Sequence, residues 1–211
     1  MNFQSDITSI LISIPIAIIS VVIHELVKSV AAFKLGDTSI KEAGRLTLNP
    51  KKHVDPLGAI FLVIFGYGWS NPVKITPFAY RERKKALLII FGIPFIVSLL
   101  IGIAFLSGLT MWNQVLIRNV LENAENAKFY LSVFNAIFHG ATINIGLALT
   151  SLIPVYPFNG AFLLNGLSPM TGAKLLRHER IFQTIVALLV IFGIFHVIIN
   201  PVVIRFLTIL Q

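Results

Sequence analysis

The sequence contains no cysteine, which excludes disulfide bonds, thiolate metal ligands and a cysteine nucleophile. Charged residues are scarce as well: they make up 12% of the 211 residues, against about 25% in globular proteins. Apolar residues make up 56% and are concentrated in long runs. These proportions argue against a soluble enzyme, a disordered tail and a nucleic-acid-binding module, and they predict an integral membrane protein.

Four stretches are long and apolar enough to span a bilayer, for which a helix needs roughly 20 residues. A shorter apolar piece, Leu57 to Phe65, is expected to be re-entrant or interfacial because it cannot span. Pro201 is expected to kink or end the last span. We therefore predict one all-α polytopic domain over residues 1–211, with about four transmembrane helices and a re-entrant or β-like segment. The expected spans are Ile7–Phe33, Ala86–Leu109, Tyr130–Ile153 and Ile181–Ile199.

The excess of basic residues, which gives a formal net charge of +8, predicts the orientation. The loop between the first two spans holds ten basic residues against four acidic ones, and the next loop is balanced. Under the positive-inside rule the N-terminus lies outside and the basic loops are cytoplasmic, in what we expect to be a bacterial cell membrane. No signal peptide is expected, since residues 1–6 carry no basic residue. The loop Thr110–Phe129 is expected outside and carries no recognisable motif.

Three ionisable residues, His24, Glu25 and Lys28, lie within the first span, where such side chains are costly and mark candidate functional sites. His24 and Lys28 share a helix face, and Glu25 can pair with Lys28. The segment reads like the zinc protease motif H-E-x-x-H, in which two histidines hold the metal and the glutamate activates water. Here a lysine stands in place of the second histidine.

Further segments resemble the site-2 protease family, the M50 intramembrane metalloproteases, especially its short bacterial members without a PDZ domain. Residues 44–50 (GRLTLNP) and 53–58 (HVDPLG) resemble the stretch that follows the family's zinc helix. Residues 68–73 (GWSNPV) are similar to its G-W-x-x-P-V turn, and residues 144–160 resemble its third-helix signature, which ends in an aspartate ligand. The match runs in family order over roughly residues 10–200. The resemblance implies the site-2 protease core fold.

The departures from the family pattern fall on the reacting groups. Lys28 replaces the second histidine ligand and Asn159 the aspartate ligand. Ser151 replaces an asparagine, and Ile93 and Val97 replace the family's glycine and asparagine around Pro94. His24, Asn144 and Glu25, at the position of the general base, remain. A protonated lysine cannot ligate zinc, and an amide is a poor ligand, so no metal or other cofactor is expected.

We therefore predict a pseudoprotease whose core is held by a polar cluster. Its members are His24, Glu25, Lys28, Asn144 and Asn159. Such a protein is expected not to be an enzyme and to bind a membrane-protein partner or a transmembrane segment in the bilayer, with Leu46–Trp69 as a strand edge for docking. No nucleic-acid partner is expected.

Two alternatives remain open. One is an active zinc protease with altered ligands, and the other is a small transporter or proton-conducting protein that uses Glu25, Lys28 and His24 as a relay. The other histidines are interpreted as structural or solvated rather than as ligands of a rebuilt zinc site. They are His53, His139, His178 and His196.

Overall fold

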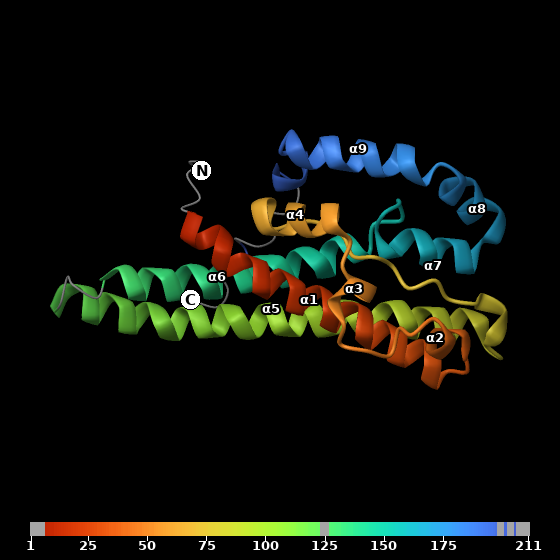
Figure 1. Ribbon diagram of the computed structural model, residues 1–211, viewed down its shortest axis with the longest axis horizontal. Helices are drawn as coiled ribbons and strands as arrows, with labels where there is room; N and C mark the ends of the chain where they lie inside the picture. The colour runs from red at the N-terminus through yellow and green to blue at the C-terminus, as the bar shows by residue number, and fades with distance from the viewer. Residues whose placement is uncertain (1–6, 123–126, 198–200, 202–204, 206–211) are drawn as a thin grey trace.

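A computed structural model of the chain describes residues 7–122, 127–197, 201 and 205. All regular secondary structure in these residues is helical (Figure 1). The helices are α1 (Ile7–Lys34), α2 (Ser39–Glu42), α3 (Pro50–His53), α4 (Pro56–Phe65), the 3-10 turn η1 (Pro77–Ala79), α5 (Arg83–Glu122), α6 (Ala127–Ser151), α7 (Asn159–Leu167), α8 (Pro169–Arg177) and α9 (Glu179–Ile191).

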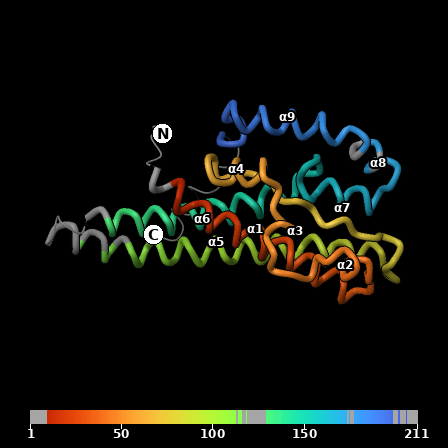
Figure 2. Tube along the Cα trace, viewed as in Figure 1, coloured from red at the N-terminus to blue at the C-terminus, as the bar shows by residue number. Residues whose placement is uncertain are grey.

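Three of these helices are long and apolar enough to cross a membrane, which confirms the expectation of an apolar, helical membrane protein. The candidate spans are Ile10–Lys34, Arg83–Trp112 and Phe129–Ser151. Helices α5 and α6 form a long antiparallel pair, and α1 packs across both of them (Figure 2). Apolar helices suit a bilayer because each satisfies its own backbone hydrogen bonds.

The expected fourth span, Ile181–Ile199, is not a continuous spanning helix in the described residues. Helix α9 covers only its first part and ends at Ile191, two residues before Gly193, whose φ is +75°. Glycine adopts this left-handed conformation without steric cost and so ends the helix. A helix of 13 residues spans about 20 Å, which is less than the hydrocarbon core. Residues 198–200, and with them the end of the predicted span, lie outside the described residues.

The segment expected to be re-entrant or β-like forms a short helix and an extended stretch. Asp55 caps α4 by accepting a hydrogen bond from the Gly58 backbone N–H at 2.8 Å, and Gly66, with φ +77°, ends the helix. Residues 67–76 then run without regular structure. Within the described part of the chain there is no strand at Leu46–Trp69, so the predicted strand edge is wrong.

The predicted outer loop Thr110–Phe129 is much shorter in the structure. Helix α5 continues to Glu122 and α6 begins at Ala127, so most of that range is helical. The candidate membrane span of α5 ends at Trp112, but the helix itself continues for ten residues beyond it. Residues 123–126 lie outside the described residues.

Helix α7 and the extended stretch bring distant parts of the sequence to α1. A buried cluster joins α1 to α5 through Ala32, Leu87 and Ile90, and Phe162 and Leu163 of α7 pack against it. Asn159 opens α7 and is itself buried. The middle of α1 is therefore enclosed by α5, α6, the start of α7 and residues 68–73.

Candidate functional site

The three ionisable residues of α1 are fully enclosed. His24 is 1% exposed, and Glu25 and Lys28 are each 0% exposed. Burial of charged groups without partners would cost several kcal/mol for each ion, so their partners decide what the site can do. Besides one another, their partners come from α5, α7, the extended stretch after α4 and Arg45, which lies between α2 and α3.

The ammonium of Lys28 donates hydrogen bonds to Glu25 and Asn159 and forms an ion pair with Glu25. Its Nζ lies 2.8 Å from Oε1 and 2.7 Å from Oε2 of Glu25. It lies 2.6 Å from Oδ1 of Asn159. A lysine ammonium has three donors and no acceptor, so both of its hydrogen-bond partners must present oxygen lone pairs. The Phe91 ring, with its centroid 5.7 Å from Nζ, covers another side of the cation.

The carboxylate of Glu25 receives further donors besides Lys28. The Ser70 hydroxyl donates to Oε1 at 2.7 Å, and the Val73 backbone N–H donates to Oε2 at 3.1 Å. The guanidinium of Arg45 lies 3.6 Å from Oε2. Because both oxygens are occupied by donors, the carboxylate is held in its charged form and is not placed to take a proton from water.

The contacts of Asn159 fix its own orientation and the tautomer of His24. The atom that faces the Lys28 ammonium must be the amide oxygen, since the ammonium can only donate. The amide nitrogen therefore faces His24, and Nδ2 lies 2.9 Å from Nε2 of that ring. Nε2 must accept this bond, so Nδ1 carries the proton and donates it to the Ser98 hydroxyl at 2.8 Å. His24 is thus a neutral imidazole, and its one lone pair is occupied by an amide N–H.

Arg45 adds a second positive charge near Glu25 and forms hydrogen bonds with the backbone of the extended stretch that covers it. It donates to the carbonyl of Lys52 and, at 2.6 Å, to the carbonyl of Asn71. Burial lowers the pKa of Arg45, whereas the negative charge of Glu25 acts in the opposite direction. A guanidinium stays charged in proteins, so the cluster carries two cations against one carboxylate.

This donor set does not fit a zinc ion. A catalytic zinc site uses three protein ligands and a water molecule, and His24 alone is a zinc-ligand type among the three positions at which the family resemblance implies ligands, His24, Lys28 and Asn159. Its free nitrogen is bonded to Asn159, and the Lys28 ammonium lies where a second ligand would stand. Across the described residues, no three histidine, cysteine, aspartate or glutamate side chains come close enough to hold a metal ion.

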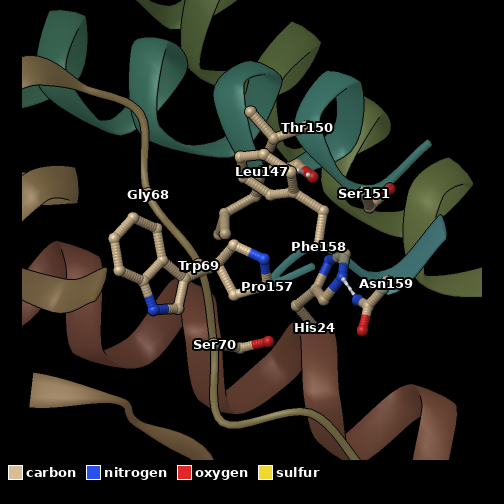
Figure 3. A pocket seen from close by; sticks show the side chains of 10 residues that line it. All are labelled: His24, Gly68, Trp69, Ser70, Leu147, Thr150, Ser151, Pro157, Phe158 and Asn159. Atoms are coloured by element: carbon tan, nitrogen blue, oxygen red, sulfur yellow. Dashed lines mark hydrogen bonds between the residues drawn. The ribbon is translucent and has the colours of Figure 1, made fainter. Parts of the chain in front are cut away.

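A small cavity lies beside the cluster, between α1, the extended stretch and the loop before α7 (Figure 3). Its volume is about 10 Å³, which is room for about one water molecule. Polar side chains in its lining come from four parts of the chain: His24, Ser70, Thr150, Ser151 and Asn159. In Figure 3 the amide of Asn159 points at the imidazole of His24 across one edge of this cavity. A peptide segment does not fit in such a space.

Asn144, the fifth residue predicted for the cluster, is placed elsewhere. Its Nδ2 donates to the Ser20 hydroxyl at 2.9 Å and to the Gly140 carbonyl at 2.8 Å. Ser20 lies on α1 one turn before His24, so Asn144 joins α6 to α1 next to the cluster. The structure therefore brings together four of the five predicted residues, and Asn144 makes a separate contact between helices.

The remaining histidines lie apart from the cluster. His53 is buried at the end of α3 and donates from Nε2 to the Thr47 carbonyl at 2.8 Å. His139 stands beside the Phe138 ring on α6, and His196 lies 6.5 Å from the Tyr67 ring. His178 is exposed between α8 and α9. Burial lowers the pKa of His53.

Sequence reasoning did not assign four groups that complete the site. Ser98 orients His24, whereas Ser70, Arg45 and the Val73 backbone N–H all face Glu25. Three of them lie within the segments that resemble the protease family, at residues 44–50 and 68–73, so the signal for them was present. Ser98 is one of many hydroxyls in apolar helices, and nothing in its local sequence distinguishes it.

No family model matches the chain, and no solved structure matches it. Among curated proteins, it is similar to one from Bacillus subtilis (strain 168) named "Putative zinc metalloprotease YwhC". The two are 29% identical over 153 residues, which cover 72% of this chain and 67% of the other protein. The chain is thus a helical membrane protein that resembles a bacterial protein named for zinc-dependent proteolysis, although its donor set does not fit zinc.

Proposed function

We propose that this protein is a site-2-protease-like (M50) membrane protein that has lost its zinc and its proteolytic activity and that assembles with a membrane partner. The similarity to the Bacillus subtilis protein and the ordered motifs from residue 24 to residue 160 support the M50-like part of the proposal. The proposal includes a location in a bacterial cell membrane, with the N-terminus outside. The start of α1 lies toward the end where α5 meets α6, and α2 and the start of α5 lie at the opposite, basic end (Figure 1).

The observation that carries the proposal is the double contact of Asn159. It accepts from Lys28 at 2.6 Å and faces the lone pair of His24 at 2.9 Å. One amide group thus contacts both Lys28, which stands in place of one ligand, and Nε2 of His24, the ligand that remains. A dication at this position would have to displace the amide and approach two positive charges, Lys28 and Arg45.

The state of Glu25 supports the loss of proteolysis separately from the metal. A general base needs a lone pair within hydrogen-bond reach of the water that it activates. Oε1 of Glu25 instead accepts from Lys28 and Ser70, and Oε2 accepts from the Val73 backbone N–H and lies 2.7 Å from the Lys28 ammonium. The same occupancy disfavours a proton relay through Glu25, because a relay group must bind and release protons in turn.

The proposed partner binds on the outer surface of the helices. The cavity beside the cluster holds about one water molecule, so a polypeptide cannot enter it as a substrate would. A partner cannot dock by strand addition at Leu46–Trp69, because the described residues of this segment form no strand. The partner therefore packs against the transmembrane helices from outside. Such contact depends on shape and packing rather than on the buried cluster.

The test measures zinc content and proteolysis on the same full-length protein. The protein is purified in detergent without chelator, its zinc is quantified by mass spectrometry, and a fluorescent transmembrane peptide is offered for cleavage. We expect zinc well below one ion per chain and no cleavage above the rate of a Glu25→Gln variant. Stoichiometric zinc would contradict the proposed loss of the metal, and cleavage that Glu25→Gln abolishes would establish an active protease with altered ligands.

A further inference from the structure

We propose that the corner between α8 and α9 is a binding site for the phosphate of an anionic phospholipid. A surface cavity of about 210 Å³ opens at this corner. It is lined by Arg177, His178, Glu179, Arg180 and Ile181. This site is remote from the polar cluster of α1, and the inference does not rest on the proposed loss of proteolysis.

The charged groups of the corner suit a phosphate. Arg177 and Arg180 are both exposed, and within the described residues neither forms an ion pair with an acidic side chain. Lys174 is exposed one turn earlier on α8 and adds a third positive charge. Against these stands Glu179, the one acidic residue of the lining. Arginine donates two parallel N–H groups to a phosphate, so two unpaired arginines at one cavity form a suitable receptor.

The apolar face of α9 explains why the phosphate belongs to a lipid. Ile181, in the cavity lining, is 58% exposed, and Ile185 and Leu188 follow on the same face at 45% and 46% exposure. The opposite face of α9 is packed, with Val186 and Val190 buried in the core. An exposed row of large apolar side chains that starts at a cationic cavity matches a molecule with a phosphate at one end and acyl chains below it.

The position of the corner agrees with the level of the lipid headgroups. Helix α8 and the start of α9 lie at the same end of the molecule as α2 and the start of α5 (Figures 1 and 2). The candidate span of α5 begins at Arg83, so this end meets the membrane surface. From the corner, α9 runs back alongside the spans, which directs its exposed apolar row into the hydrocarbon region. Basic side chains at this level attract anionic lipids.

The experiment titrates the full chain in detergent with phosphatidylglycerol or phosphatidylcholine and counts bound lipids by native mass spectrometry. We expect the wild type to prefer phosphatidylglycerol and the double variant Arg177→Gln/Arg180→Gln to bind it about thirtyfold more weakly, from the loss of two surface charges. The matched control is Lys51→Gln/Lys52→Gln, which removes two exposed charges from α3, outside the cavity. The control is expected to bind like the wild type.

Three outcomes would overturn the proposal. Equal binding by the wild type and the arginine variant would show that the cavity is not the site. An equal loss in the lysine control would show that affinity follows total charge rather than this corner. Displacement of phosphatidylglycerol by inorganic phosphate at equal concentration would show that the ligand is a free anion, without a contribution from the apolar row of α9.

Discussion

Asn159 places its amide nitrogen 2.9 Å from Nε2 of His24, a residue that lies 135 positions earlier in the sequence. In a zinc site that nitrogen would point at the metal, and here it accepts a hydrogen bond from an amide. The same amide turns its oxygen toward Lys28. Lys28 and Asn159 are therefore complementary, because the Asn159 amide bridges the Lys28 ammonium and the His24 imidazole.

The first prediction concerns the pairing of Lys28 with Glu25. Lys28→Met leaves the Glu25 carboxylate buried with only Arg45 as a nearby cation, at 3.6 Å. Loss of one partner of a buried ion pair costs about 3 kcal/mol or more, so we expect a clearly lower Tm in detergent. The double variant Lys28→Met/Glu25→Gln removes both charges, and its amide N–H can donate to Asn159. It should recover most of the loss. If both variants melt like the wild type, the cluster does not stabilise the fold.

The second prediction introduces the two zinc ligands that the family resemblance implies at positions 28 and 159. In Lys28→His/Asn159→Asp, the introduced side chains together with His24 supply three ligands of the types that zinc prefers. The excess positive charge of the cluster also falls, because one cation is removed and one carboxylate is added. We expect the purified double variant to retain about one zinc ion per chain. Zinc measured by mass spectrometry, with and without dialysis against a chelator, checks this.

The single variants serve as controls for that experiment. Lys28→His leaves the Asn159 amide on His24, and Asn159→Asp leaves the Lys28 ammonium beside the new carboxylate. Each therefore still lacks one ligand, and neither should retain zinc. Metal binding by the wild type at the level of the double variant would contradict this explanation, because it would show that ligands other than these form a site.

The local sequence of α1 already indicated its part of the cluster. The spacing of Glu25 and Lys28 predicted their pairing, which the structure shows at 2.7 Å. The contact of Asn159 with Lys28 could not follow from spacing, since the two residues are 131 positions apart, and only the family resemblance predicts it. The separate position of Asn144 was missed because helix rotation decides whether a residue on α6 meets Ser20 or His24, and periodicity does not determine the rotation between two helices.

Hydropathy predicted the three long spans but not the shape of the connections. The apolar run after residue 180 has the length of a span, yet Gly193 adopts a left-handed conformation and α9 ends just before it. The run Leu57–Phe65 was too short to be assigned from periodicity alone. The carboxylate of Asp55 at its start and Gly66 at its end make it a helix. Turn residues of this kind act locally and carry little weight in a hydropathy profile.

The third prediction is a dependence of stability on pH that arises from His53. Its side chain is buried, and burial lowers its pKa below the ordinary value of 6.5. The folded protein therefore holds His53 neutral, whereas the unfolded chain protonates it near pH 6.5. Unfolding takes up a proton, so this contribution to stability is complete above about pH 6.5 and decreases as the pH falls toward the folded-state pKa.

The measurement compares Tm at pH 7.5 and pH 5 in the wild type and in His53→Gln. The glutamine can donate to the Thr47 carbonyl as His53 does, but it does not titrate. We expect the wild type to lose more stability on acidification than the variant. A parallel decrease in both proteins would assign the pH dependence to other groups.

The fourth prediction concerns the close approach of α4 to Trp69, which positions the donors of Glu25. A Cβ atom on Gly58 would lie 2.1 Å from the Trp69 carbonyl oxygen and 2.8 Å from Cδ1 of its ring. Gly58→Ala must therefore displace the backbone at Trp69, the residue before Ser70, and overpacking of this kind costs about 1–3 kcal/mol. We expect a lower Tm together with weaker contacts from Ser70 and Val73 to Glu25.

The matched control is Gly92→Ala on α5, where an added Cβ meets no atom within 4 Å. This substitution should be neutral or slightly stabilising, since alanine favours a helix interior over glycine by about 1 kcal/mol. A combined variant, Gly58→Ala with Glu25→Gln and Lys28→Met, separates packing from electrostatics. If α4 acts only through packing, the cost of Gly58→Ala is the same with and without the charges. If α4 also positions Ser70 and Val73 on the carboxylate, the cost is smaller once the carboxylate is removed, and we expect this second result.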